Sequence, residues 1–391
     1  MDAKRTDLID PRREELLFVA TTPGLEPALE REVRRMGLGI WRVGGGVEVR
    51  GAPGLHRVLN LRLRTASRVL LRIASFPAKD VPTLNAGLQR TALVDFWEGR
   101  TPLELAVTAH RSKLSHAGKV RELAAKAWGA QLATASREQE EEGGGDALRL
   151  QLRLEDDVCT VSVDTSGELL YRRGYRQEIS RAPLRETLAA GMLELAGYRG
   201  DEALWDPMCG SGTLPIEAAL IALRRAPGIA RTFAFERFPS HDARAWEELK
   251  KQARAEEQPR PPKSIRATDL HSGALGTARR NARRAGVLEH LTLERQDVTK
   301  PTALPSEPAG LLIANPPYGI RVGEDRELVP LYRALGDLLR ERLPAGWRAA
   351  VLLPDPRLER ALGLEVDDAF DVQNGGIRCQ LVLAAAQRAR G

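Results

Sequence analysis

The strongest constraint on the fold is a regular alternation of short apolar stretches with helical stretches from about residue 184 onward. Apolar stretches such as ALWDPM, SIRATDL, LTLERQD, GLLIANPP and WRAAVLLP are separated by segments with helical periodicity. This alternation is typical of right-handed βα units, which build a mostly parallel sheet. Residues 224–263 are rich in Pro, Arg and Glu, and we expect them to form an insertion in this α/β domain.

A glycine-rich turn follows the first of these strands. In DPMCGSGT the strand is expected to end at Asp206, and Gly210 and Gly212 frame a tight turn before a helix. Glycines let the backbone approach a ligand closely, and the start of a helix offers free N–H donors. The turn is neither a GK[ST] phosphate loop nor a GxGxxG motif with an acid about twenty residues later. By itself it is weak evidence for a ligand.

Two further acids are expected at the ends of the next two strands. Asp269 closes SIRATDL and Asp297 closes LTLERQD. Any one of these aspartates could simply cap the following helix. Because the carboxyl ends of parallel strands face a common crevice, three acids in series favour a ligand site. The set suits a cofactor with an amino acid end, a ribose and an adenine amine.

The fourth strand, GLLIANPP, runs into a rigid turn. Pro316 and Pro317 follow Asn315 and lack backbone donors, so the turn is expected to face outward with Tyr318 at its tip. Alone, such a turn is ordinary. As the fourth member of the series of strand ends, it indicates a substrate site.

The first half of the chain shows a different pattern. A strand, a helix and a second strand are expected between residues 16 and 51, and 61–73 predicts a helix leading into a strand. LRLQLRL alternates leucine with polar residues, and VCTVSVD returns after the turn EDD. This predicts an antiparallel hairpin with one buried face. The mixture of short elements predicts an α+β half, with an acidic, glycine-rich loop at 136–147.

Composition narrows the classes of protein to consider. There are 59 Lys plus Arg against 53 Asp plus Glu, a net charge of +6, and arginine outnumbers lysine. Arginine suits a polyanion partner, although GC-rich codon usage is the simpler explanation. No apolar run could span a membrane, and the polar N-terminus disfavours secretion, so a cytoplasmic location is expected. Three widely spaced cysteines and six histidines without ligand-like spacing predict no metal site.

The four strand-end motifs together resemble those of class I S-adenosylmethionine-dependent methyltransferases that act on exocyclic or amide nitrogens. Outside them, FVATTPGLEPALEREV, VSVDTSGELLYRRGYR, APLRETLAAGML and NGGIRCQLVL look like bacterial THUMP-domain guanine-N2 methyltransferases of the large-subunit ribosomal RNA. The resemblance covers 16–385 and includes part of the expected insertion, PGIARTFAFERFPSHDARAW.

The resemblance implies an α+β N-terminal half that holds RNA, followed by a Rossmann-like catalytic domain. Some family members carry a second methyltransferase domain after this one, and because the sequence ends at Gly391 we expect that activity to be absent. The expected organisation is a disordered tail at 1–15, a ferredoxin-like piece at 16–60, a THUMP RNA-binding domain at 61–168, a connector at 169–183 and the methyltransferase domain at 184–391.

The resemblance also implies S-adenosylmethionine as the cofactor and assigns residues to it. Asp269 would accept the ribose hydroxyls, Asp297 would accept from the adenine amine, and Thr187 would close the methionine end. The implied cofactor-binding set is Thr187, Asp206, Cys209, Gly210, Gly212, Asp269, Asp297 and Asn315.

The implied reaction is methyl transfer to a guanine amine, whose lone pair is delocalised into the ring. The Asn315 side-chain oxygen and the Pro316 carbonyl would accept its N–H bonds, Pro317 would stiffen the turn, and Tyr318 would stack on the base. This is catalysis by positioning and electrostatics. Because the base must leave its stack, we expect base flipping or a single-stranded target.

RNA contacts are expected where basic residues cluster or are interleaved with aromatic ones. The connector and one stretch of the THUMP half meet this description, whereas the arginines at 279–284 are expected to form a solvated helix face. The candidates are Arg111, Lys113, Lys119, Arg172, Arg173, Tyr175 and Arg176.

Three alternative functions stay open. A THUMP-type transfer-RNA guanine-N2 methyltransferase shares the same motifs. A DNA adenine-N6 methyltransferase also uses an NPPY turn, although the expected RNA-binding half argues against DNA. A non-catalytic RNA-binding assembly factor is disfavoured by the intact DPMCGSGT and NPPYG motifs. The sequence implies no particular oligomer and does not identify the modified nucleotide.

Overall fold

The computed structural model describes residues 10–133, 147–177, 184–317, 325–355 and 357–385. It forms two compact units, and two of the boundaries between them fall inside helices. The first unit contains Met1–Thr21, Val33–Leu170 and Arg231–Lys251, and the second contains Thr22–Glu32, Tyr171–Ala230 and Gln252–Gly391.

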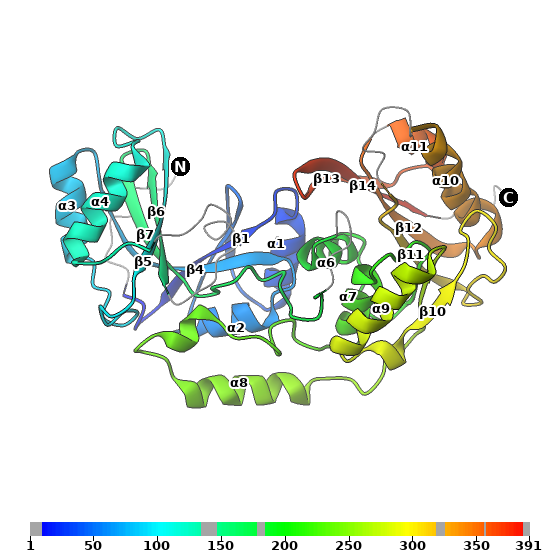
Figure 1. The fold of residues 1–391 in the computed structure, drawn as a ribbon, viewed down its shortest axis with the longest axis horizontal. Coiled ribbons are helices and arrows are strands. Elements are labelled where there is room, and N and C mark those ends of the chain that lie inside the picture. The colour runs from blue at the N-terminus through cyan, green and yellow to red at the C-terminus, as the bar shows by residue number, and fades with distance from the viewer. Residues whose placement is uncertain (1–9, 134–146, 178–183, 318–324, 356, 386–391) are drawn as a thin grey trace. The chain divides into compact units, whose positions relative to one another are not determined.

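The first unit is built on a seven-stranded sheet with the order β2-β3-β1-β4-β7-β6-β5 (Figure 1). Neighbouring strands are antiparallel, except that β5 and β6 are parallel. The elements up to residue 164 are β1 (Glu15–Thr21), α1 (Glu26–Arg35), β2 (Ile40–Val43), β3 (Gly46–Gly51), α2 (Leu55–Arg62), β4 (Ala66–Pro77), α3 (Val81–Arg90), β5 (Leu103–His110), α4 (Ala117–Trp128), β6 (Leu148–Glu155) and β7 (Val158–Asp164).

The predicted hairpin is confirmed as β6 and β7. The two strands pair antiparallel, with Leu152 opposite Val161 and Leu150 opposite Val163. These four side chains are fully buried, because the alternation places every second residue on the core face.

The long strand β4 belongs to both parts of this sheet. On one side it pairs with β1, where Val69 lies opposite Val19, and on the other side it pairs with β7, where Phe76 lies opposite Cys159. The stretches expected to form a ferredoxin-like piece and a THUMP domain therefore share one sheet. The boundary between them stays a prediction.

The second unit contains a seven-stranded sheet with the order β10-β9-β8-β11-β12-β14-β13. The first five strands are parallel, and β14 runs antiparallel to both β12 and β13. The elements after residue 184 are α6 (Glu186–Leu195), β8 (Ala203–Asp206), α7 (Thr213–Ala222), η1 (Ala234–Arg237), α8 (Ala243–Ala255), β9 (Ile265–Asp269), α9 (Ser272–Arg284), η2 (Leu288–His290), β10 (Thr292–Arg295), β11 (Ala309–Ala314), α10 (Asp325–Asp337), η3 (Leu338–Arg342), β12 (Gly346–Leu353), α11 (Arg357–Leu362), β13 (Asp368–Asn374) and β14 (Ile377–Ala385).

Helices cover both faces of this second sheet. Leu311 and Ile313 of β11 pack into one core with α6, α7 and α9, whereas Leu312 and Ala314 pack into the other with α10 and α11 (Figure 1). A strand buried on both faces has a continuous apolar sequence, as in GLLIA. The predicted fold class, an α+β half followed by a Rossmann-like α/β domain, is confirmed.

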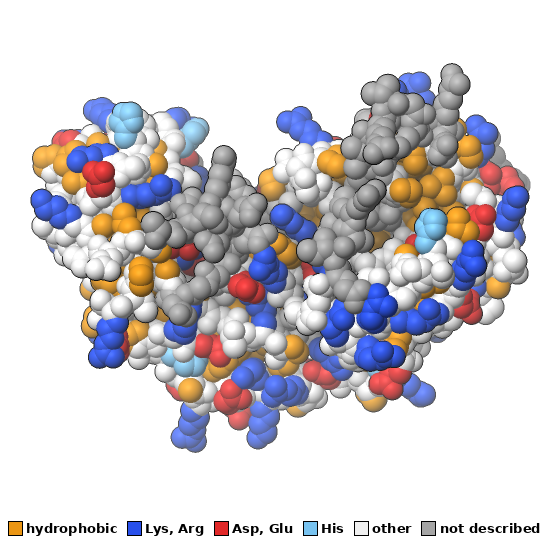
Figure 2. All heavy atoms as spheres, in the orientation of Figure 1, with side chains coloured by type: hydrophobic (Ala, Val, Ile, Leu, Met, Phe, Trp, Pro, Cys, Tyr) orange, Lys and Arg blue, Asp and Glu red, His pale blue; other side chains and the backbone are white. Residues whose placement is uncertain are grey.

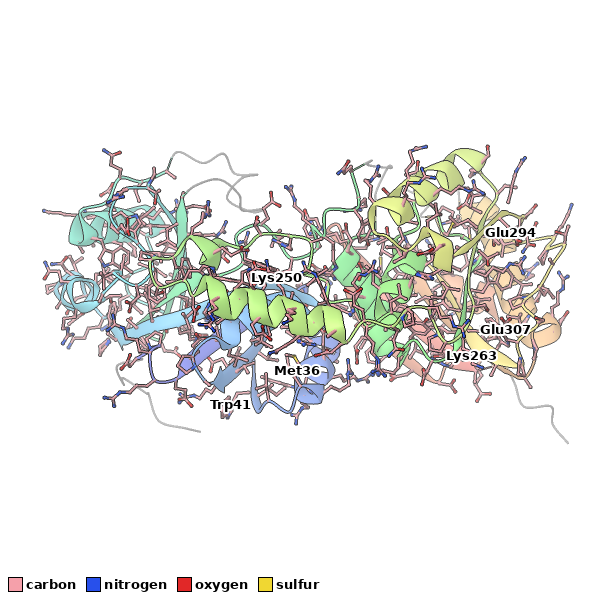
Figure 3. All side chains as sticks on the ribbon, turned by 90° about the horizontal axis from the view of Figure 1, so that it is seen from below. Met36, Trp41, Lys250, Lys263, Glu294 and Glu307 are labelled. Carbon is pink, nitrogen blue, oxygen red and sulfur yellow. The ribbon has the colours of Figure 1, made fainter. Side chains whose placement is uncertain are left out.

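The expected insertion contains a helix, and part of it groups with the first unit. The Phe235 ring centroid lies 5.2 Å from that of His56 and 5.1 Å from that of Trp246. Lys250 of α8, labelled in Figure 3, lies 5.2 Å from the Trp246 ring. The sequence predicts that residues 231–251 belong to the domain at 184–391. In the structure they group with the first unit. In the described part of the chain, no helix has the length and apolar character needed to cross a membrane.

Candidate active site

Four neighbouring strands of the second sheet, β10, β9, β8 and β11, lead to the residues singled out in the sequence. The chain passes from β8 outward to β9 and β10, and then returns on the other side of β8 as β11. The direction of winding therefore reverses between β8 and β11. Ligands of open α/β sheets bind at the carboxyl ends of the strands at such a point. Asp206, at the end of β8, and Asn315, directly after β11, stand on its two sides.

Backbone hydrogen bonds fold the segment after β8 into a tight loop. Met208 N donates to Asp206 Oδ1 at 3.0 Å, and Gly212 N donates to the Cys209 carbonyl at 2.8 Å. Cys209 N donates to the Thr268 carbonyl at 2.9 Å. The loop is thus tied both to its own strand and to β9.

The two glycines of this loop have different tasks. Both have a positive φ, 52° at Gly210 and 86° at Gly212. A Cβ at Gly212 would lie 3.0 Å from the Ala278 Cβ, so this glycine lets α9 pack against the loop. A Cβ at Gly210 would meet none of the described atoms within 4 Å. Gly210 therefore leaves open space against exposed backbone, which a ligand can use.

Asp269 links the glycine loop to the start of α9. Its Oδ2 accepts from Gly210 N and its Oδ1 from His271 N, both at 2.9 Å. The sequence left open whether this aspartate caps a helix or faces a ligand. In the structure it holds the turn before α9 and also lies at the glycine loop.

Two groups in the loop region are buried and electrostatically perturbed. Asp206 is 1% exposed, and this burial raises its pKa well above the usual range. The hydrogen bond from Met208 acts to lower the pKa, and the charge of Asp269 acts to raise it. Burial likewise raises the pKa of Cys209, which makes the thiol an unreactive packing group. A cationic ligand group beside Asp206 would favour its charged form.

Asp297 lies farther from its strand than expected. β10 ends at Arg295, and the Asp297 carboxylate accepts from Thr299 N at 2.8 Å and from Thr299 Oγ1 at 2.7 Å. These hydrogen bonds lower the pKa of Asp297. The Oδ1 oxygen of Asp297 is therefore engaged in a local turn with Thr299.

Sequence reasoning missed the inner face of α9. Asn281 is 1% exposed, and its Nδ2 donates to the Ser211 carbonyl of the glycine loop at 2.9 Å. Arg284 donates to Asn281 Oδ1 and, through Nε, to the Tyr175 carbonyl at 2.8 Å. Helical spacing from the buried Ala278 indicates that Asn281 faces inward, but it does not identify Ser211 as its partner.

The expected substrate turn is described only in part. Asn315 is partly buried, Pro316 is buried and Pro317 is exposed, whereas Tyr318 lies outside the described residues. Thr187 is 1% exposed in the first turn of α6. Its predicted role at the methionine end stays a prediction.

Arginines of the connector point inward. Arg173 Nε donates to Glu217 Oε1 at 3.2 Å, and the Tyr175 hydroxyl donates to the same oxygen at 2.9 Å. Arg176 Nε lies 3.2 Å from Glu186 Oε1. The side chains of Arg173 and Tyr175 are buried, so this corrects their expected place on an RNA-binding surface. Arg172 is partly exposed.

The basic residues expected in the THUMP half lie at the surface of the first unit. Arg111 forms two hydrogen bonds to Asp156, at 2.9 and 3.1 Å, and Lys119 lies 3.4 Å from Glu122. The backbone N of Lys113 donates to Asp157. These three side chains are exposed and stay candidates for RNA contact.

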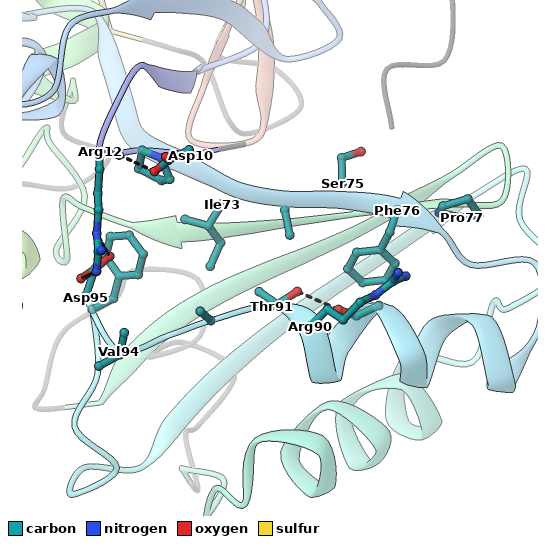
Figure 4. Close-up of a pocket in the computed structure, with 15 residues that line it drawn as sticks. Asp10, Arg12, Ile73, Ser75, Phe76, Pro77, Arg90, Thr91, Val94 and Asp95 are labelled. Atoms are coloured by element: carbon teal, nitrogen blue, oxygen red, sulfur yellow. Dashed lines mark hydrogen bonds and ion pairs between the residues drawn. The ribbon is translucent and has the colours of Figure 1, made fainter. Parts of the chain in front are cut away.

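A cavity of about 700 Å³ lies in the first unit, apart from the predicted site residues. Ile73 and Phe76 of β4 point into it, and the ion pair between Arg12 and Asp95 lies at its side (Figure 4). Among the described residues, no group of three or more His, Cys, Asp or Glu side chains could hold a metal ion.

Several relatives share this sequence over most of its length. The ribosomal RNA large subunit methyltransferase K/L of Syntrophotalea carbinolica is 37% identical over 93% of this chain and 53% of that protein. The enzyme of the same name from Legionella pneumophila strain Philadelphia 1 is 34% identical over 95% and 54%. The chain thus spans about half the length of the curated relatives it matches.

Solved structures share the fold. A possible methylase from Clostridium difficile 630 matches with a TM-score of 0.84 and 28% identity, over 97% of this chain and all of that one. The SMU.472 structure, solved in complex with SAH, matches with a TM-score of 0.83, 26% identity and the same coverage.

Two family models match separate parts of the chain. Residues 16–70 match the RlmL ferredoxin-like domain, and residues 173–382 match the RMKL-like methyltransferase domain. The resemblance seen in the sequence motifs is therefore confirmed, and this chain belongs to the family of the RMKL-like methyltransferase domain.

Proposed function

We propose that this chain is an S-adenosylmethionine-dependent methyltransferase that modifies the exocyclic N2 of a guanine in large-subunit ribosomal RNA. The order β10-β9-β8-β11 supports this most, because it brings the ends of the strands that carry Asp269, Asp206 and Asn315 next to one another. The relatives named ribosomal RNA large subunit methyltransferase K/L support the RNA class. The first unit would hold the RNA, and the cytoplasm would be the location.

The residues at this sheet edge fit the proposed cofactor. Open space at Gly210 leaves room for a ligand against the backbone, and Asp206 and Asp269 are acceptors for an amine and for ribose hydroxyls. Leu270, next to Asp269, is 47% exposed and offers an apolar surface to a flat base. When bound, S-adenosylmethionine supplies a methyl group already activated by its sulfonium.

Asn315 would position the amine that receives the methyl group. Its place after β11, across the switch point from Asp206, suits a substrate that approaches the cofactor from the other side. The Asn315 amide oxygen and the Pro316 carbonyl would accept the two N–H bonds of the guanine amine, which makes its lone pair available. No strong base is needed, because positioning and electrostatics lower the barrier.

Two substitutions test the roles at the site. Asn315→Ala should lower the rate of methyl transfer by about 100-fold or more, comparable to loss of an oxyanion-hole donor, with cofactor affinity retained. Asp269→Asn should weaken cofactor binding in calorimetry while it keeps one acceptor oxygen for the loop. Near-normal turnover of the first variant, or unchanged cofactor affinity of the second, would remove the assigned role.

The substrate class is tested by radiolabelled methyl transfer to purified 23S RNA and to bulk transfer RNA in parallel. Both RNAs should come from a strain that lacks the gene, so that the target is unmodified. We expect label in the 23S RNA, at guanine N2 after nucleoside analysis. Label only in transfer RNA would assign the chain to the transfer-RNA enzymes, and no label in either would contradict the proposal.

A further inference from the structure

Exposed arginines gather on α9 and on the neighbouring strand β10. Arg279, Arg280 and Arg283 of α9 and Arg295 of β10 are all exposed, and we call this group the α9 patch. Figure 2 shows Lys and Arg side chains collected over α9. Arg284 of the same helix is excluded from the patch, because it braces Asn281 and the connector.

The charge pattern of α9 differs from that of an ordinary solvated helix. Its sequence, SGALGTARRNARR, contains no acidic residue. Arg279 and Arg283 are four residues apart on one face, where like charges repel by about 0.2–0.5 kcal/mol. In α8, by contrast, Glu247 and Glu248 accompany the basic residues, and Lys250 lies 2.5 Å from Glu247. GC-rich codon usage could explain the high arginine content, but it does not explain why α9 lacks acidic residues and α8 contains them.

The α9 patch lies on the helix that begins beside the candidate active site. α9 begins three residues after Asp269, and at a rise of 1.5 Å per residue its arginines lie roughly 10–20 Å along the axis from that carboxylate. Arg279 Nη2 donates to the Leu293 carbonyl at 3.1 Å, and Arg295 Nε donates to the Leu270 carbonyl at 3.0 Å. These contacts hold the two side chains against β10 and against the segment that follows β9.

Acidic residues close to the patch in sequence have other contacts. Glu294 lies 2.8 Å from Arg266, and Glu289 lies 3.6 Å from His290. The patch presents the exposed side chains of Arg279, Arg280 and Arg283 on the unit that carries the candidate site. Guanidinium groups match phosphate oxygens in charge and geometry.

We propose that the α9 patch binds the phosphate backbone of the RNA substrate next to the target nucleotide. This inference rests on the proposed function and adds a second RNA-binding surface, on the catalytic unit. It also replaces the solvated helix face expected from the sequence. Phosphate contacts hold a substrate in register without reading its sequence, which is the task that a catalytic unit needs beside a flipped base.

The test compares two triple variants of the full chain with the same change in charge. The patch variant is Arg279→Gln, Arg280→Gln and Arg283→Gln. The matched control is Arg254→Gln, Arg260→Gln and Lys263→Gln, which removes three exposed charges from the same unit outside the patch. Affinity for a 23S RNA transcript is measured by filter binding over a series of salt concentrations, and cofactor affinity by calorimetry.

We expect the patch variant to lose about tenfold or more in RNA affinity, and its slope of log K against log salt to flatten by about 0.7–0.9 per lost phosphate contact. Cofactor affinity should be unchanged in both variants, and the control should keep nearly all of its RNA affinity. Wild-type affinity and slope in the patch variant would overturn the inference, and so would an equal loss in the control. If the wild-type chain itself neither binds nor methylates the RNA, the proposed function fails, which is a different result.

Discussion

Two arginine-rich segments of the second unit differ in their surroundings. In the connector segment YRRGYR at 171–176, Arg173 and Arg176 face buried acids, Glu217 and Glu186. In the segment RRNARR at 279–284, most of the arginines lie on the exposed side of α9, a helix without acids. The same residue type thus stabilises the interior in one place and offers charge to the solvent in the other. The position of the acids, rather than the number of arginines, separates the two roles.

The acids that decide this difference are buried in two helices, α7 and α6. Glu217 is fully buried in α7, TLPIEAALIA, and Glu186 is 2% exposed in α6. A buried carboxylate is stable only when it is paired or hydrogen-bonded. Arg173, Arg176 and Tyr175 supply these partners, and the connector is thereby fastened to the helix that follows the glycine loop.

The largest effect is expected from Glu217→Gln. This substitution keeps the shape of the side chain but leaves the buried Arg173 without its counter-charge, which typically costs about 3–5 kcal/mol in the free energy of unfolding. Urea denaturation measures the loss. Glu289→Gln, at an exposed position of the same unit, is the control and should change stability by less than about 0.5 kcal/mol. A loss below about 1 kcal/mol for Glu217→Gln would mean that the connector arginine is not held by this pair.

A second prediction concerns pH. Burial raises the pKa of Glu186 from 4.5 to about 7, although Arg176 and Arg173 act to lower it and Glu217 to raise it. The folded state therefore keeps a proton that the unfolded state has lost, so stability should fall as pH rises from about 4.5 to 7 and then level off. The shift corresponds to about 3 kcal/mol over that window.

Denaturation of Glu186→Gln at several pH values isolates this contribution. The variant cannot ionise at this position, so its stability should decline less than that of the wild type between pH 5 and 7. Identical pH profiles for the two proteins would show that Glu186 ionises normally in the folded state.

The sequence predicted the frame of the candidate site well, because periodicity and strand ends are local features. The hairpin β6–β7, the strands of the second sheet and the order of the strand-end motifs follow from alternation and from βα units. Side-chain contacts between residues far apart in the sequence do not follow from these local patterns. Neither the contact of Arg173 with Glu217, 44 residues away, nor that of Asn281 with Ser211, 70 residues away, has a local signature. For that reason the sequence alone predicted Arg173 to lie at the surface, whereas it is buried against Glu217.

The inner face of α9 should behave differently from its outer face. Asn281→Ala removes the hydrogen bond to the Ser211 carbonyl and leaves buried partners unsatisfied, at a cost of about 1–3 kcal/mol. Because Ser211 lies between Gly210 and Gly212, cofactor affinity should fall as well. Calorimetry and denaturation together check both effects. Lower stability with unchanged cofactor affinity would make Asn281 a packing residue only.

The smallest effect on stability is expected on the outer face of α9. It is a gain in stability, whereas the other substitutions cause a loss. Arg283 is three residues from Arg280 and four from Arg279, so Arg283→Gln relieves two like-charge contacts of about 0.2–0.5 kcal/mol each. The variant should be slightly more stable than the wild type at low ionic strength, and the difference should shrink when salt screens the charges. Paired urea titrations at two salt concentrations can resolve it, with Arg173→Gln as the contrasting substitution, because loss of the buried arginine must destabilise. If Arg283→Gln instead costs more than about 1 kcal/mol, Arg283 has a structural partner of its own, and the contrast between the two arginine-rich segments would be lost.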